Sequence, residues 1–87
     1  MIQLRYQLVF TSRAKKDLNR LPASLLDRFT KAFEQIARDP YCGKALKGEL
    51  HNLFSYRMGD YRIIYQIEKN KVTVIVLKIG HRKDVYK

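Results

Sequence analysis

The sequence has little that could cross-link or anchor the chain. Its 87 residues include a single cysteine, Cys42, so no intramolecular disulfide can form. No stretch approaches the roughly 18–20 consecutive apolar residues that a membrane-spanning helix needs. The N-terminus shows no signal peptide. These absences predict a protein without disulfides or membrane spans that works in the reducing cytoplasm.

Sequence patterns for metal or nucleotide binding are also absent. Cys42, His51 and His81 do not have the spacing of zinc ligands. The segment that contains Gly43 and Gly48 lacks the spacing of a phosphate-binding Walker loop. We therefore expect neither a metal ion nor another cofactor.

Acidic residues are scarce relative to basic ones. Eighteen Lys and Arg face eight Asp and Glu, which gives a formal net charge of +10 at pH 7. The cations alternate with apolar residues along the chain, so they belong to a folded domain and not to a disordered arm. Such a field favours a polyanionic partner, which could be nucleic acid, an anionic membrane or an acidic protein. A basic surface that is merely well solvated is the alternative interpretation.

Hydrophobic periodicity predicts a single α+β domain over residues 1–87. A first strand is expected at residues 5–10, because aromatic and branched side chains alternate there. Helical spacing of apolar residues then predicts helices at 12–20 and 23–38. Pro22 lies near the start of the second helix, where its missing N–H costs nothing, and Pro40 stops that helix.

The second half of the chain is expected to form an antiparallel meander after a loop at residues 41–52. Its three strands are predicted at residues 53–58, 61–68 and 72–79. Gly59 and Asp60 would form the first tight turn, and Gly80 would end the last strand. The order is then β-α-α-β-β-β, with the first strand parallel to the last. A helical hairpin would pack on one face of the twisted sheet and leave the opposite face open for a ligand.

Strand alternation places two cations together on that open face. If the tight turn pairs its two strands, Arg57 and Arg62 lie near one another. Two adjacent guanidinium groups repel each other unless an anion lies between them, and their planar forks suit a phosphate. Two ordinary solvent-facing arginines are the alternative.

Three residues after the last strand are expected beside that arginine pair: His81, Arg82 and Tyr86. Neighbouring cations disfavour a protonated imidazole, which leaves His81 able to accept a proton. Together these groups suit cleavage of RNA by its own 2′-OH. A base takes the 2′-OH proton, arginines stabilise the charge at phosphorus, and an acid protonates the leaving 5′-oxygen. A lone polar residue in the tail is the simpler interpretation of His81.

Four segments resemble RelE-type toxins of the RelE/ParE toxin–antitoxin superfamily. They are residues 12–18, 46–48, 56–65 and 79–86, of which the last two are the most specific together. The resemblance implies a metal-independent endoribonuclease that depends on the ribosome and cuts mRNA in the ribosomal A site. It also implies a cognate antitoxin, expected to be acidic, that neutralises the toxin in a hetero-oligomeric complex.

The resemblance also implies roles for individual residues. Arg62 would act on the transition-state phosphate, and Arg82 would serve as acid or phosphate ligand. Tyr86 would stack on or activate the substrate, and His81 stands at a position that is basic in relatives. Ser55 stands where some relatives carry a cation. The further expected contacts to mRNA and 16S ribosomal RNA are Arg57, Lys44, Lys47, Lys15 and Lys16.

Two other functions stay open on the sequence alone. A ParE-like toxin with the same fold would inhibit DNA gyrase without cutting RNA, and it would not need the arginines and the tyrosine just described. A non-cleaving basic RNA-binding module would be harmless when expressed without a partner.

Overall fold

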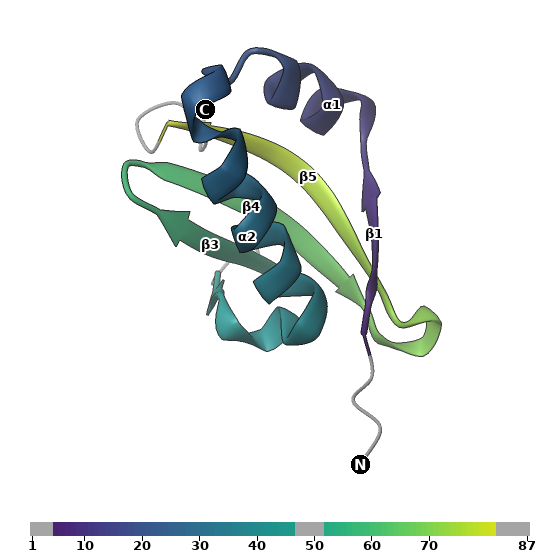
Figure 1. Cartoon of the computed structure of the whole chain (residues 1–87). Coiled ribbons are helices and arrows are strands. Elements are labelled where there is room, and N and C mark those ends of the chain that lie inside the picture. Colours follow the sequence, from purple (N-terminus) through teal and green to yellow (C-terminus); the bar gives the residue numbers. More distant parts are fainter. Residues whose placement is uncertain (1–4, 47–51, 82–87) are drawn as a thin grey trace.

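Two helices cover one face of a five-stranded sheet in the computed structural model, which describes residues 5–46 and 52–81 (Figure 1). The strands are β1 (Gln7–Phe10), β2 (Lys44–Ala45), β3 (Leu53–Met58), β4 (Tyr61–Glu68) and β5 (Thr73–His81). The helices are α1 (Ser12–Asn19) and α2 (Leu26–Arg38), and short 3-10 turns occur at Ala23–Leu25, Pro40–Cys42 and Lys69–Lys71. The predicted α+β fold is confirmed.

The sheet has the strand order β1-β5-β4-β3-β2. β1 pairs parallel with β5, as the sequence predicted, and the other neighbours are antiparallel. β2 lies at the edge beside β3, within the segment that was expected to be a loop. A strand of two residues is too short to produce a periodic pattern, so hydrophobic alternation could not have indicated it.

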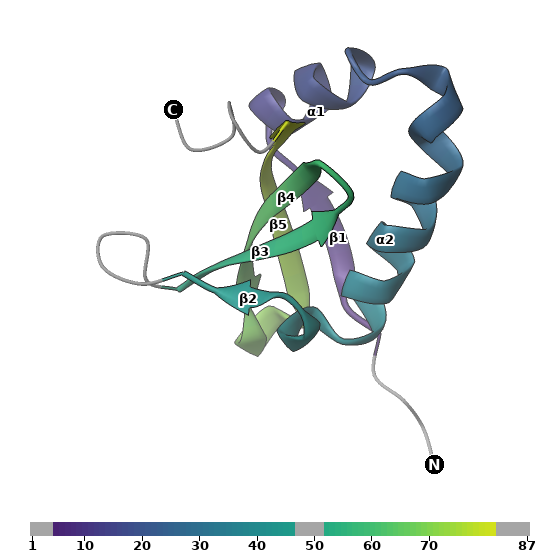
Figure 2. The same cartoon turned by 90° about the vertical axis from the view of Figure 1, so that its left-hand side faces the viewer.

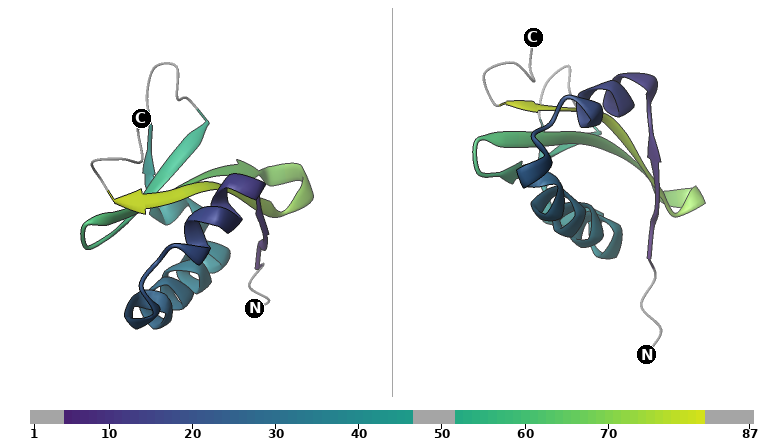
Figure 3. Two further views of the ribbon diagram at one scale, coloured as in Figure 1. Left: turned by 90° about the horizontal axis from the view of Figure 1, so that it is seen from above. Right: turned by 45° about the horizontal axis from the view of Figure 1, so that its top comes forward.

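Local sequence explains where α1 begins and which residues α2 buries. The hydroxyl of Thr11 accepts a hydrogen bond from the Ala14 N–H at 3.1 Å and so caps α1. α2 turns Phe29, Ala32 and Ile36 toward the sheet, where all three side chains are buried. Figures 2 and 3 show both helices on the same side of the sheet, and no described helix lies on the other side. The helices therefore pack on one face as predicted, and the opposite face, called the open face below, carries no helix of the described residues.

The core lies between the helices and the central strands. Ile63 and Tyr65 on β4 and Val74 and Val76 on β5 are fully buried against it. Aromatic rings also connect α2 to β4, because Phe29 and Tyr61 pack edge to face with their centroids 5.6 Å apart. This packing holds the central strands in place and fixes the side chains that they carry on the open face.

A β-bulge in β5 reverses the alternation of its side chains. Ile64 pairs with Lys78, whereas Tyr65 pairs with Val76, so Leu77 is an extra residue. From that point the even-numbered Lys78 faces the open side, and Ile79 enters the core. The strand also continues through Gly80 to His81, so the predicted end at residue 79 was wrong.

α1 supports the bulged part of β5 on the side that β1 no longer reaches. The Thr11 hydroxyl donates to the carbonyl of Leu77 at 2.9 Å. One carboxylate oxygen of Asp17 accepts the N–H of Ile79 at 3.0 Å. The helix thereby supplies the partners that a longer β1 strand would have supplied.

Candidate functional site

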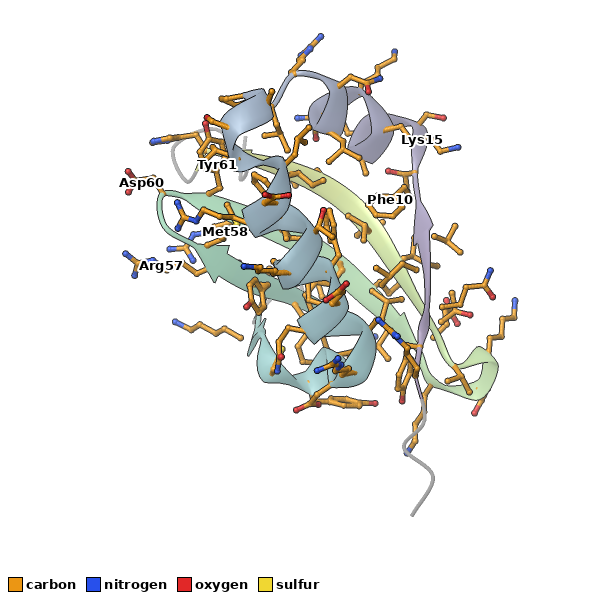
Figure 4. The ribbon with its side chains drawn as sticks, viewed as in Figure 1. Phe10, Lys15, Arg57, Met58, Asp60 and Tyr61 are labelled. Atoms are coloured by element: carbon orange, nitrogen blue, oxygen red, sulfur yellow. The ribbon has the colours of Figure 1, made fainter. Side chains whose placement is uncertain are left out.

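The β3–β4 hairpin places two arginines side by side on the open face. Gly59 has φ +61° at the first turn position, which is the position that a type II′ turn gives to glycine. The register that follows sets Arg57 directly opposite Arg62. Figure 4 shows Arg57 pointing outward from the hairpin, whereas the neighbouring Met58 is buried in the core. The predicted proximity of Arg57 and Arg62 is confirmed.

Neither arginine is neutralised within the described residues. Arg57 is exposed, and its Nε donates to the carbonyl of Gly59 at 3.2 Å. Arg62 is half-buried, and its Nε is buried without any hydrogen-bond partner in residues 5–46 and 52–81. No carboxylate of those residues forms an ion pair with either side chain. A buried donor without a partner costs about 1–3 kcal/mol, which an anion bound here would recover.

A cavity of about 450 Å³ opens beside this pair at the edge of the sheet. Its lining residues are Cys42, Gly43, Lys44, Ser55, Tyr56, Arg57 and Arg62. Three cations therefore border one cavity, and its described lining contains no acidic residue. Partial burial and the nearby Asp39 carboxylate raise the pKa of the Cys42 thiol. A thiol in that state stays protonated and is a poor nucleophile, so the cavity is suited to binding an anion and not to covalent catalysis by cysteine.

Tyr65 fixes the position of the β2 edge and so the position of Lys44. Its buried hydroxyl donates to the carbonyl of Pro40 at 2.6 Å, and burial raises the pKa of the Tyr65 hydroxyl. Gly43 passes so close to this hydroxyl that a Cβ atom at Gly43 would overlap it. From there the chain brings Lys44 opposite Ser55 on β3.

His81 does not lie where the sequence predicted. It pairs with Tyr61, and the two rings meet in a T-shape with centroids 5.9 Å apart. It borders a separate cavity of about 250 Å³ that Arg13 and Asp17 of α1 also line. The expectation that His81 shares a face with Arg57 and Arg62 was wrong, because the bulge at Leu77 turns His81 to the helix-covered side. Its catalytic role stays a prediction.

The other predicted site residues fall into two groups. Lys47, Arg82 and Tyr86 lie outside the described residues. Lys15 and Lys16 are exposed on α1, and Figure 4 shows Lys15 on the side of the molecule away from Arg57. The two α1 lysines are thus separate from the arginine pair and could only contact a different part of a large partner.

Lys78 is a cation of the open face that the sequence did not predict. Strict alternation from the buried Val74 and Val76 would put Lys78 in the core. The bulge moves it to the open face, opposite Ile64. The only signal in the sequence is chemical, because a lysine among apolar residues is rarely buried.

In the described part of the chain, no three His, Cys, Asp or Glu residues are grouped so that they could hold a metal ion. No helix within the described ranges is long and apolar enough to cross a membrane.

The order of the five strands and the two helices on one face match the fold of solved RelE toxin structures. The family described as "ParE toxin of type II toxin-antitoxin system, parDE" matches residues 8–86. The chain therefore belongs to the RelE/ParE superfamily of type II toxins.

Several similar proteins are named as RelG or RelE toxins. Toxin RelG of Mycobacterium tuberculosis is 39% identical, over 94% of this chain and 97% of the relative. The crystal structure of the toxin–antitoxin complex RelBE2 from the same organism matches with a TM-score of 0.84 and 38% identity, over 95% of this chain and 98% of that one. The isolated Escherichia coli RelE toxin matches with a TM-score of 0.76 and 26% identity, over 93% of this chain and 90% of that one.

Proposed function

We propose that this toxin cleaves mRNA and uses the Arg57–Arg62 pair to hold the scissile phosphate. The observation that carries the proposal is the direct opposition of two arginines that have no acidic partner in the described residues. The buried and unpartnered Nε of Arg62 adds a donor that a phosphate oxygen would satisfy. A bound phosphate would replace the repulsion between the two guanidinium groups with two attractive interactions.

The reaction we propose needs no metal ion. The 2′-OH of the nucleotide attacks the adjacent phosphate, Arg57 and Arg62 stabilise the charge that develops on its oxygens, and the 5′-oxygen leaves. Arg82 and Tyr86 follow β5 in the chain and are the proposed proton-transferring groups. His81 is kept as a weaker candidate, because its side chain is on the other face of the sheet.

The substrate we propose is mRNA in the A site of the ribosome, which also sets the cytoplasm as the place of action. Lys15 and Lys16 are exposed on α1, away from the arginine pair, so they would contact 16S ribosomal RNA and not the scissile strand. Lys47 is a further proposed RNA contact. Contacts of this kind weaken steeply with added salt, because each releases counterions from the RNA.

A cognate antitoxin is the protein partner that we propose. The similar RelBE2 structure is a toxin–antitoxin complex. A chain with a formal charge of +10 favours an acidic partner that reduces its self-repulsion. The antitoxin would neutralise the toxin in a hetero-oligomer.

Growth arrest tests the assignment of the site. Expression of the wild type should stop growth, whereas Arg62→Ala combined with Tyr86→Ala should abolish arrest in a protein that stays folded. The matched control is Lys69→Ala with Lys71→Ala, which also removes two groups but in the exposed turn between β4 and β5. Undiminished arrest by the Arg62/Tyr86 double variant would contradict the proposal.

Inhibition of DNA gyrase is the second candidate, because the matching family is described as ParE toxin. Mapping of mRNA 5′ ends after induction separates the two functions. Cuts in register with codons support cleavage in the A site. DNA damage with intact mRNA would support gyrase inhibition instead.

A further inference from the structure

We propose that Lys44 and Lys78 form a second phosphate-binding position on the open face, so that the toxin holds two consecutive phosphates of a single RNA strand. This inference rests on the proposed function, because it extends the Arg57–Arg62 site to the neighbouring nucleotide. It assigns a role to Lys78 and gives Lys44 a partner.

The two lysines stand in one row across four strands. Lys44 on β2 lies opposite Ser55 on β3. Ser55 lies opposite Ile64 on β4, and Ile64 lies opposite Lys78 on β5. The row therefore begins and ends with a cation, and all four residues face the open side of the sheet.

Ser55 and Ile64, in the middle of this row, are buried, with relative exposures of 4% and 1%. Both side chains are shorter than a lysine, so the ammonium groups of Lys44 and Lys78 can extend farther from the sheet than either of them. Three strand spacings of about 4.8 Å separate the lysine backbones by roughly 14 Å. Two lysine side chains that extend toward each other can span that distance with an anion between their ammonium groups. Lys44 is exposed and Lys78 is half-buried, so the ends of both can reach solvent.

The lysine row lies two residues along the strands from the arginine pair. Ser55 precedes Arg57 by two residues on β3, and Ile64 follows Arg62 by two residues on β4. Two residues along a strand span about 6.6–6.8 Å. That separation is comparable to the distance between successive phosphates of an extended RNA strand, so two rows of cations present two phosphate positions.

Charge on this part of the open face is of one sign. Within the described ranges no ion pair involves Lys44, Lys78 or either arginine of the pair. Glu68 lies toward the other end of β4, where it accepts a hydrogen bond from Gln66 at 3.2 Å. Four cations without a neutralising carboxylate repel each other, and an extended polyanion relieves that repulsion at both positions together.

Binding of an uncleavable trinucleotide tests the inference. The probe is a 2′-O-methyl RNA trinucleotide, which carries two internucleotide phosphates and lacks the attacking hydroxyl. Lys44→Gln with Lys78→Gln retains much of both side-chain stems and removes two charges. The matched control, Lys69→Gln with Lys71→Gln, removes the same charge at the exposed 3-10 turn. Unfolding in urea establishes that each variant is folded.

The Lys44/Lys78 variant should bind the probe roughly tenfold more weakly than the control, which corresponds to about 1.4 kcal/mol. Its slope of log affinity against log salt should be shallower by about 0.7, because the variant neutralises one phosphate fewer on a single strand. Replacing either phosphate of the probe with a neutral methylphosphonate should weaken its binding to the wild type. The Lys44/Lys78 variant should be insensitive to the replacement of one of the two phosphates, because it has already lost the lysines that bind that phosphate.

Two results would overturn the inference, and they are distinguishable. If the Lys44/Lys78 variant binds like the control while Arg57→Gln with Arg62→Gln loses binding, the second phosphate position is wrong and the proposed function stands. If Arg57→Gln with Arg62→Gln binds the probe like the wild type, the proposed function fails together with the inference. The same conclusion follows if the wild type does not bind the probe at low salt.

Discussion

The proposed role of Arg57 and Arg62 is ligand binding, because their direct opposition in the sheet does not favour stability. Like charges placed directly opposite each other on two strands destabilise a sheet by about 0.2–1 kcal/mol. Each arginine also lacks an acidic partner among the described residues. Selection for stability alone would not favour such a pair. Substitutions at these two arginines should therefore raise the free energy of unfolding while they lower activity.

The variant Arg57→Gln should therefore be at least as stable as the wild type. Removing one of two opposed charges should raise the free energy of unfolding by up to about 0.5 kcal/mol, even as RNA cleavage falls. Urea unfolding at low salt measures the change, which should shrink in high salt because the repulsion is screened. A loss of more than about 1 kcal/mol would mean that the Arg57 side chain stabilises the hairpin.

Tyr65 should make the fold sensitive to alkali. Burial raises the pKa of its hydroxyl in the folded state, so the folded protein keeps a proton that the unfolded chain loses near pH 10. The resulting stability is fully present below about pH 10 and is lost as the pH rises toward the folded-state pKa, by about 1.4 kcal/mol per pH unit. Tyr65→Phe should remove this loss. Urea unfolding of both proteins between pH 9 and about pH 11.5 should give a shallower decline for the variant.

The neutral-pH behaviour of the same variant supplies the control. Tyr65→Phe removes the donor to the Pro40 carbonyl and should cost about 1–2 kcal/mol at pH 7. If the two proteins instead lost stability in parallel above pH 10, Tyr65 would ionise freely in the folded state, and its buried hydrogen bond would be contradicted.

At the scale of elements, the α1 region provides hydrogen bonds to the part of β5 that extends beyond β1. β1 ends at Phe10, opposite Val76, and β5 continues to His81. Thr11 and Asp17 of the α1 region satisfy the backbone of β5 beyond that point. The helix therefore sets the direction in which the last strand leaves the sheet.

Asp17→Ala should destabilise the protein by about 1–3 kcal/mol, because the buried N–H of Ile79 would lose its acceptor. Asp17→Asn should restore most of this loss, since its amide oxygen can accept the same hydrogen bond. It loses only the ion pair with Arg13, which lies 3.2 Å away and is largely exposed. Amide hydrogen exchange at Ile79 reports the bond directly and should accelerate in the alanine variant.

The exposed Glu34 on α2 provides the matched substitution of an acid by alanine. Glu34→Ala should change stability by no more than about 0.5 kcal/mol. If Asp17→Ala behaved like Glu34→Ala, the proposed support of β5 by α1 would be wrong.

The sequence predicted the elements well because their signals are local. The bounds of β3 and β4 were correct to the residue, since alternating side chains flank a glycine-containing turn. The bulge residue Leu77 accepts a hydrogen bond from Thr11, which is 66 residues away in the chain, and no local sequence pattern reveals such a contact. The unpredicted bulge at Leu77 accounts for two errors in the site, which are the wrong face for His81 and the omission of Lys78.

At the scale of the whole molecule, the two helices and four of the cations lie on opposite faces of the sheet. The helices bury one side of the sheet and leave the side with Arg57, Arg62, Lys44 and Lys78 uncovered by any described helix. A formal net charge of +10 would attract the proposed RNA substrate over a long range, and that attraction would depend strongly on salt. The sequence predicted the net charge and the arginine pair, and the sheet register was needed to show which lysines join them.

Cleavage on purified ribosomes tests the central claim most directly. Ribosomes with a defined mRNA and an empty A site would be incubated with the wild type or with the folded Arg57→Ala/Arg62→Ala variant, and the RNA ends would be mapped. The wild type should cut within the A-site codon in the presence of a metal chelator that leaves the ribosomes intact, and should leave the 2′,3′-cyclic phosphate that attack by a 2′-OH produces. The variant should lose at least about 100-fold in rate. Cleavage by the variant at the wild-type rate, or no cleavage by either protein, would contradict the account.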